Sequence, residues 1–164
     1  MATRMDRIQA FCRPGQSGFS MVEVLVALVV LAIGLLGIAA LYLNSLQSGR
    51  TAIYRTQAVT LAADLADRIR MNRTAQASYG TLFADAEVAV AACDTTGGCT
   101  DADLAATDLS RWKATVAQFL PNGEGQVAVT LPVAAGEPTN YVVTVRWAEV
   151  GELAPVTFQI GFAT

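Results

Sequence analysis

The chain has 164 residues, of which 53% are hydrophobic and only 15% are charged, and its formal net charge is −3. This length predicts one compact domain with appendages. The chain has no histidine, which removes the usual general base and zinc ligand, and its few basic residues form no stripe along which nucleic acid could bind. We therefore expect no enzyme, no catalytic residues, no cofactor, no metal and no nucleic-acid partner.

The first 18 residues are basic, with three arginines against one aspartate, and they end in a turn-rich stretch at 14–18. A run without any charge follows from Val24 to Leu43. As a helix rising about 1.5 Å per residue, this run is long enough to cross a membrane core about 30 Å thick. The positive-inside rule places the arginine-bearing end in the cytoplasm and residues 44–164 across the membrane.

Glu23 lies at the start of this apolar segment, where a carboxylate has no obvious structural use. Placing an acid within the membrane costs about 2.5–3.5 kcal/mol on insertion scales. The first hypothesis for such a residue is therefore that it has a function. Two ordinary interpretations remain open. One is a signal peptide cleaved near residues 37–39, and the other is a plain single-pass anchor.

The residues Gly18-Phe19-Ser20-Met21-Val22-Glu23, together with the apolar run behind them, favour a third interpretation. They resemble the class III leader junction of type IV pilins and type II secretion pseudopilins. The resemblance implies that a prepilin peptidase removes residues 1–18. It would cut between Gly18 and Phe19 and methylate the new N-terminal Phe19. Glu23 would then be the fifth residue of the mature chain.

Such a cut creates an α-amino group with a pKa near 8, which is mostly protonated at neutral pH. In a filament, the amine of an incoming subunit could pair with Glu23 of its neighbour, since an unpaired charge is costly in a low dielectric. The carboxylate would then set the register between subunits. In the alternative interpretation, Glu23 reaches the cytoplasmic membrane surface and has no role.

The helical pattern continues beyond the membrane segment, and no proline occurs from Phe19 to Leu120. One apolar stripe is formed by Tyr54, Ala58, Leu61, Leu65 and Ile69. We expect one helix from Phe19 to about Asn72, divided into a filament-core half at 19–45 and an amphipathic extension at 46–73. Charged pairs are expected on its wet side, namely Asp64 with Arg68 and Asp67 with Arg70. The cluster Arg68, Arg70 and Arg73 suits a helix C-terminus, although a partner-binding patch stays open.

Two of the three cysteines, Cys93 and Cys99, are separated by five residues in the predicted head, 74–164. Two thiols without histidine cannot fill a structural zinc shell. We favour a structural disulfide in the periplasm, while a redox-active pair stays an alternative. Cys12 would remain with the cytoplasmic leader.

Thr100 begins a second helical segment, with acids in its first turn. Its apolar stripe consists of Ala105, Leu109, Trp112, Val116 and either Phe119 or Leu120. Asp101, Asp103 and Asp108 lack the spacing of a calcium loop, so we interpret them as helix-start charges.

After residues 121–123 the apolar period becomes two, which predicts three strands over residues 127–133, 141–147 and 156–162. Their short connections predict an antiparallel meander with one apolar face, and Pro132 could blunt one open edge. The predicted fold class is α+β: a long N-terminal helix packed on a small antiparallel sheet, as in pilins.

The segments Leu61–Asn72 and Cys99–Trp112 resemble those of PilV-type minor pilins. The resemblance implies a subunit anchored by one pass in the inner membrane, with a periplasmic head, which later enters the pilus. Its implied partners are other minor pilins, the major pilin, the prepilin peptidase and the inner-membrane assembly platform. A type II secretion pseudopilin and a membrane-anchored binding module remain alternatives.

Overall fold

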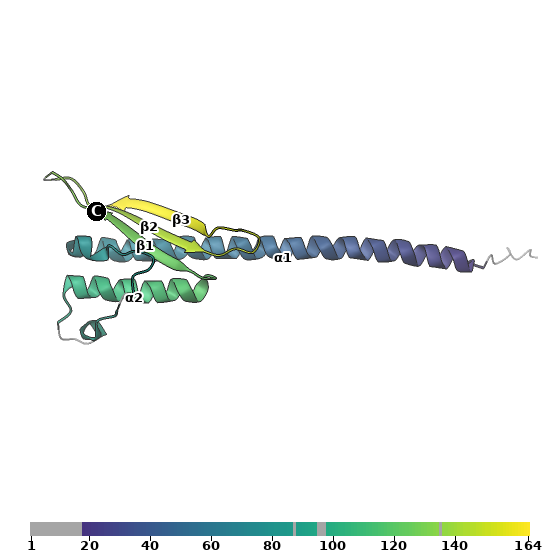
Figure 1. Ribbon diagram of the computed structural model, residues 1–164, viewed down its shortest axis with the longest axis horizontal. Helices are drawn as coiled ribbons and strands as arrows, with labels where there is room; N and C mark the ends of the chain where they lie inside the picture. Colours follow the sequence, from purple (N-terminus) through teal and green to yellow (C-terminus); the bar gives the residue numbers. More distant parts are fainter. Residues whose placement is uncertain (1–17, 87, 95–97, 135) are drawn as a thin grey trace, which may run out of the picture. The chain divides into compact units, whose positions relative to one another are not determined.

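The computed structural model describes residues 18–86, 88–94, 98–134 and 136–164 (Figure 1). The chain forms two compact units, Met1–Ser45 and Leu46–Thr164, and helix α1 contributes to both. The elements in chain order are α1 (Met21–Met71), η1 (Arg73–Tyr79), η2 (Ala91–Asp94), α2 (Asp101–Phe119), β1 (Glu124–Thr130), β2 (Asn140–Trp147) and β3 (Val156–Ala163).

In the first unit, α1 begins two residues later than the sequence predicts. The hydroxyl of Ser20 accepts a hydrogen bond from the backbone N–H of Glu23 at 3.2 Å, and the Ser20 carbonyl accepts from the same N–H at 3.1 Å. Ser20 therefore caps the helix from outside it, as serine commonly does. The most apolar window of α1 has a mean hydropathy of 3.1, none of it is buried, and this is the one helix among the described residues that could cross a membrane.

In the second unit, one face of α1 lies in the hydrophobic core. Ala58, Ala62, Leu65 and Ile69 have no exposed surface, while Tyr54 and Leu61 pack at the margin. The predicted stripe is therefore confirmed, and Ala62 and Ala66, which are also fully buried, widen it. Small side chains at these positions allow the sheet and α2 to approach the helix backbone closely.

Helix α2 supplies the second wall of that core. Thr100 caps it with both hydrogen bonds of a capping box: its hydroxyl accepts from the N–H of Asp103, whose carboxylate accepts from the N–H of Thr100. The indole N–H of Trp112 donates to the Leu61 carbonyl at 2.9 Å and so joins α2 to α1. Leu120 is buried and Phe119 is exposed, which decides the alternative that the sequence left open.

The three strands form an antiparallel sheet in the order β1-β2-β3, so the predicted meander is confirmed. The central strand β2 is buried on its inner face through Tyr141, Val143, Val145 and Trp147. In the second unit the sheet lies over α1 and α2 (Figure 1). The predicted α+β, pilin-like fold is confirmed.

The prediction for the first strand was wrong at its end. Strand β1 begins at Glu124 and stops at Thr130, and Leu131 and Val133 lie beyond it in exposed positions. Pro132 has no backbone N–H and a fixed φ, so it cannot continue the ladder. It therefore follows the strand instead of blunting a sheet edge. Gly125 lies inside β1 because a Cβ there would come within 2.3 Å of the Trp112 ring.

Candidate functional site

The predicted leader junction lies just before α1. Gly18 and Phe19 are exposed and outside regular structure, with 82% of the Phe19 surface accessible. A Cβ added at Gly18 would meet nothing within 4 Å. The fold itself therefore does not require glycine at this position, and any requirement must come from a molecule that acts on the chain. Residues 1–17, including Cys12, lie outside the described residues.

Glu23 is the third residue of α1, where the positive end of the helix dipole favours a negative charge. Its side chain is exposed, and together with Phe19, Val24 and Leu28 it lines a shallow hollow. The structure thus brings Phe19 and Glu23 to the same surface at the helix start. Sequence reasoning missed the capping role of Ser20, although the spacing Ser-x-x-Glu signals it.

The apolar residues of α1 behind Glu23 have no partner in the described part of the chain. Leu28, Leu31, Leu35 and Leu36 are each more than half exposed, and so is nearly every apolar residue up to Leu46. Burying one such side chain is worth roughly 1.5–3 kcal/mol. A continuous surface of this kind needs lipid or other helices around it.

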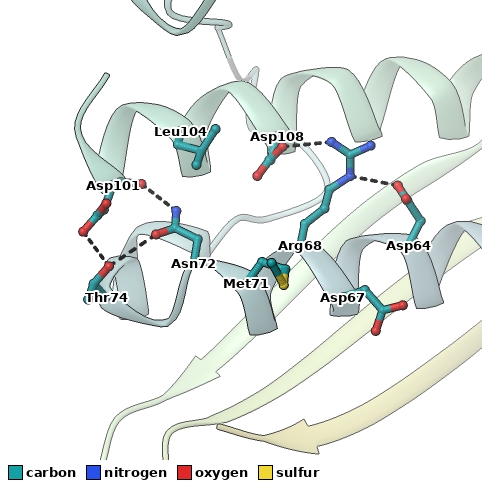
Figure 2. Close-up of a pocket in the computed structure, with 9 residues that line it drawn as sticks. All are labelled: Asp64, Asp67, Arg68, Met71, Asn72, Thr74, Asp101, Leu104 and Asp108. Atoms are coloured by element: carbon teal, nitrogen blue, oxygen red, sulfur yellow. Dashed lines mark hydrogen bonds and ion pairs between the residues drawn. The ribbon is translucent and has the colours of Figure 1, made fainter. Parts of the chain in front are cut away.

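A polar network joins the end of α1 to α2, and Figure 2 shows most of it. Arg68 binds Asp108 through Nη1 at 2.9 Å and Asp64 through Nε at 3.0 Å. The hydroxyl of Tyr79 donates to the other oxygen of Asp108 at 3.0 Å, and Asn72 donates to the Asp101 carbonyl at 2.8 Å.

The interpretation of Asp108 as a helix-start charge was wrong. Asp108 lies two turns into α2 on the face that meets α1, and only 8% of its surface is exposed. A buried carboxylate needs a cation and hydrogen-bond donors, which Arg68 and Tyr79 supply. Asp101 and Asp103 do lie in the first turn of α2, as expected.

The network shifts two ionisation equilibria. Burial raises the pKa of Tyr79 to about 12, and the Asp108 charge adds to the shift against the opposing bond from Asn72. The hydrogen bond to Asp108 also raises the pKa of Arg68. Tyr79 therefore stays a protonated donor and Arg68 a cation at any ordinary pH. Such fixed partners hold two helices together and offer no group poised to transfer a proton.

The basic cluster at the end of α1 is engaged within the chain. Arg70 pairs with Asp67 at 2.7 Å, and its guanidinium lies 4.6 Å from the centre of the Phe162 ring. Arg73 donates through Nε to the carbonyl of Arg70 at 3.2 Å. These contacts agree with the helix-end interpretation of the cluster.

Cys93 and Cys99 form a disulfide with their Cα atoms 4.8 Å apart, as the sequence predicted. The bond joins η2 to the residue that precedes the Thr100 cap of α2. Within the described residues, no group of three or more acidic, cysteine or histidine side chains is arranged to hold a metal ion.

Two family models match the chain, and they adjoin each other. Residues 13–39 match the prokaryotic N-terminal methylation motif, which covers Gly18, Phe19 and Glu23. Residues 40–110 match the model described as type IV pilin Tt1218. Together they support the type IV pilin superfamily for this chain.

The pilin assignment agrees with the fold and suggests a structural subunit. The leader motif and the family imply cleavage by a prepilin peptidase and assembly with other pilins. The motif and the apolar helix support a membrane-anchored pilin. No curated protein and no solved structure matches the chain.

Proposed function

We propose that the chain is a minor pilin of a type IV pilus, which takes part in priming assembly or in the tip complex. The observation that carries this proposal is the contrast along α1. Its first half is apolar and exposed around its whole surface, while one face of its second half is covered by the chain's own head. A helix of this kind is built to pack among equivalent helices from other subunits.

In such packing, Glu23 would set the axial register between neighbouring subunits. We propose that cleavage after Gly18 leaves the protonated amine of Phe19 beside the helix start, where Glu23 already lies. In a bundle of helices, the amine of one subunit then pairs with Glu23 of another, because either charge alone is costly away from water. Subunits that are displaced along the axis lose this pair, so the carboxylate selects one stagger.

The topology follows from the charges at the two ends of the apolar run. The basic residues 1–18 stay in the cytoplasm, and the helix extension at 46–73 and the head at 74–164 lie in the periplasm. The disulfide fits an oxidising compartment on the head side. The partners proposed from this placement are the other minor pilins, the major pilin and the inner-membrane assembly platform.

The minor-pilin role is supported by the resemblance of Leu61–Asn72 and Cys99–Trp112 to PilV-type sequences. Both segments contribute to the network around Arg68 and Asp108, which fixes the α1–α2 junction of the head. A type II secretion pseudopilin shares the leader motif. The two functions differ in where the mature chain is found, in sheared surface pili or in a short periplasmic filament.

The decisive experiment follows Glu23→Gln, which removes the charge and keeps the side chain's size. We expect normal cleavage, read as the intact mass lacking residues 1–18 and carrying one methyl on Phe19. We expect the amount of the variant in sheared pili to fall at least about tenfold, corresponding to about 1.4 kcal/mol of lost pairing.

Glu152→Gln is the matched control, because Glu152 is an exposed carboxylate on a turn of the head. It should be cut and incorporated like the natural chain. Normal incorporation of Glu23→Gln would remove the register role, and a chain that keeps residues 1–18 in the membrane would reduce the protein to a plain anchor.

A further inference from the structure

The two outer edges of the sheet differ, and the β1 edge is already paired at Val127. Thr81 and Val127 exchange both backbone hydrogen bonds at 3.0 Å, so residue 81 acts as a one-residue strand beside β1. Lys113 holds this segment in place. Its ammonium donates to the Thr81 hydroxyl at 2.6 Å, to the Leu82 carbonyl at 2.7 Å and to the Asp85 carbonyl at 2.8 Å.

The β3 edge is open in the part of the chain that the structure describes. Thr139 and Thr164 exchange both backbone hydrogen bonds, at 3.0 and 3.1 Å. In an antiparallel pair, hydrogen-bonded and non-hydrogen-bonded positions alternate. In this register, the backbone N–H and C=O groups of Phe162, Ile160 and Phe158 point toward β2. The outward N–H and C=O groups belong to Thr157, Gln159, Gly161 and Ala163.

This edge carries none of the usual protection against strand pairing. Proteins guard such edges with charged side chains, prolines or bulges. Residues 156–164 contain no charge and no proline, and the four outward positions are all exposed. The register of β3 against β2 is continuous from Val156 to Ala163, without a bulge.

The inner face of β3 is incompletely covered as well. Val156, Phe158, Ile160 and Phe162 touch the core but remain half-buried, whereas the matching residues of β2 are fully buried. A further strand beside β3 would cover them with its own inward side chains. The edge thus offers backbone groups and apolar surface together, which is the combination used in recognition by strand addition.

We propose that the β3 edge binds an extended, uncharged strand of a different pilus subunit, which continues this head's sheet across the subunit boundary. The bound strand would place an apolar side chain at every second position, facing inward beside Phe158, Ile160 and Phe162. The proposal rests on the proposed function and names the head surface through which this subunit selects its neighbour.

A second copy of the chain fits this edge poorly. Its β1 edge is interrupted at its centre by Thr81, so its own β3 is the edge that offers an unbroken row of backbone groups. Two uncharged β3 strands would pair antiparallel about a two-fold axis. Within the head, β3 runs toward the same end as α1 residues 46–71 (Figure 1), so the axis would also reverse that helix. Chains inserted in one membrane by the same leader share one orientation, which this pairing does not allow.

Hydrogen–deuterium exchange tests the proposal on the full mature chain. Exchange is compared between the chain in sheared filaments and the purified chain in detergent, by targeted mass spectrometry of peptides that cover β3. In detergent, the amides of Thr157, Gln159, Gly161 and Ala163 should exchange fast. In filaments they should exchange at least about tenfold more slowly, because a paired strand must open before exchange.

A single proline substitution adds a test that leaves the sheet intact. Gln159→Pro removes one outward donor and no bond to β2, and proline is tolerated where a strand N–H faces solvent. The variant should keep its cleavage and its thermal unfolding in detergent, and its amount in filaments should fall about tenfold. Gln159→Thr keeps the backbone N–H at the same position and should be incorporated normally.

The outcomes separate this proposal from the proposed function. If the mature chain is present in filaments but its outward amides exchange as fast as in detergent, the strand-docking proposal is wrong and the pilin role stands. Absence of the chain from filaments, including pseudopili, would overturn both. If the purified chain alone forms a dimer that protects the same amides, the partner is a second copy and the proposed subunit is wrong.

Discussion

The two halves of helix α1 use apolar residues in opposite ways. Between Val24 and Leu43 the side chains are apolar on all sides and exposed, whereas beyond residue 53 one stripe is buried and most of the remainder is polar. Both halves belong to one continuous α-helix, so helix propensity does not distinguish them. The distinction lies in what the rest of the chain supplies. The head provides a cover for the second half, and other molecules must provide it for the first.

The acids of the two regions show the same contrast. Asp108 is buried beside Arg68 and Tyr79, so its charge is balanced within the head. Among the described residues, no ion pair involves Glu23, which lies at the exposed start of α1. A carboxylate that is balanced inside the chain stabilises a fold, while one that is not can select a partner.

The largest expected effect comes from making the same substitution in each half. Leu65 has no exposed surface and Leu36 is 71% exposed. Leu65→Ala should lower the free energy of unfolding of the head by about 2–5 kcal/mol, because it leaves a cavity. Leu36→Ala should leave that free energy unchanged. Urea unfolding of the full chain in detergent, followed by tryptophan fluorescence, measures both.

The fluorescence reports the head alone, since Trp112 and Trp147 are the only tryptophans and both are buried there. Equal destabilisation by the two substitutions would show that the first half of α1 also packs against the head. A stable Leu65→Ala variant would contradict the core described above.

A smaller loss is expected when the Asp108 network is broken. Asp108→Asn should reduce the free energy of unfolding by about 1–3 kcal/mol, since Arg68 loses its buried anion. Asp64→Asn removes the exposed i,i+4 partner of the same arginine and should cost less than about 0.5 kcal/mol. Unfolding in urea at neutral pH compares the two. The reverse ranking would mean that the exposed pair carries the α1–α2 junction.

The last effect is absent at neutral pH and appears only at high pH. The unfolded chain ionises Tyr79 near pH 10, whereas in the folded head its pKa is about 12. Between these values the native state holds the proton that the unfolded state has lost, so stability falls as pH rises. Between pH 9 and 12, the melting temperature of Tyr79→Phe should fall less steeply with pH than that of the natural chain. Below pH 9, the two curves of melting temperature against pH should be roughly parallel. Identical slopes would show that Tyr79 is solvated in the folded head.

Sequence periodicity predicted most of the fold because the chain separates its patterns clearly. The stripe at 54–69, the Thr100 cap and the alternation in 141–147 each fall within a single element. The error at 131–133 arose because alternation continued through Pro132, where hydrogen bonding could not. Periodicity reports the side chains, while the ladder depends on the backbone.

The site was predictable only where its residues are adjacent in the chain. Gly18, Phe19 and Glu23 form one short motif, and the matched methylation motif covers all three. Their roles in cleavage, methylation and register stay predictions. The network of Arg68, Tyr79 and Asp108 joins residues that are 11 to 40 positions apart, and no local pattern marks it. The open β3 edge likewise required the strand order, which short connections suggested but could not fix in register.

Ser20 has a consequence for the order of maturation. The helix cap is made by a residue on the retained side of the proposed cut, and it bonds to Glu23 within α1. The peptidase can therefore trim a helix that is already complete, so that processing exposes a new charge without any refolding of the segment that will carry it.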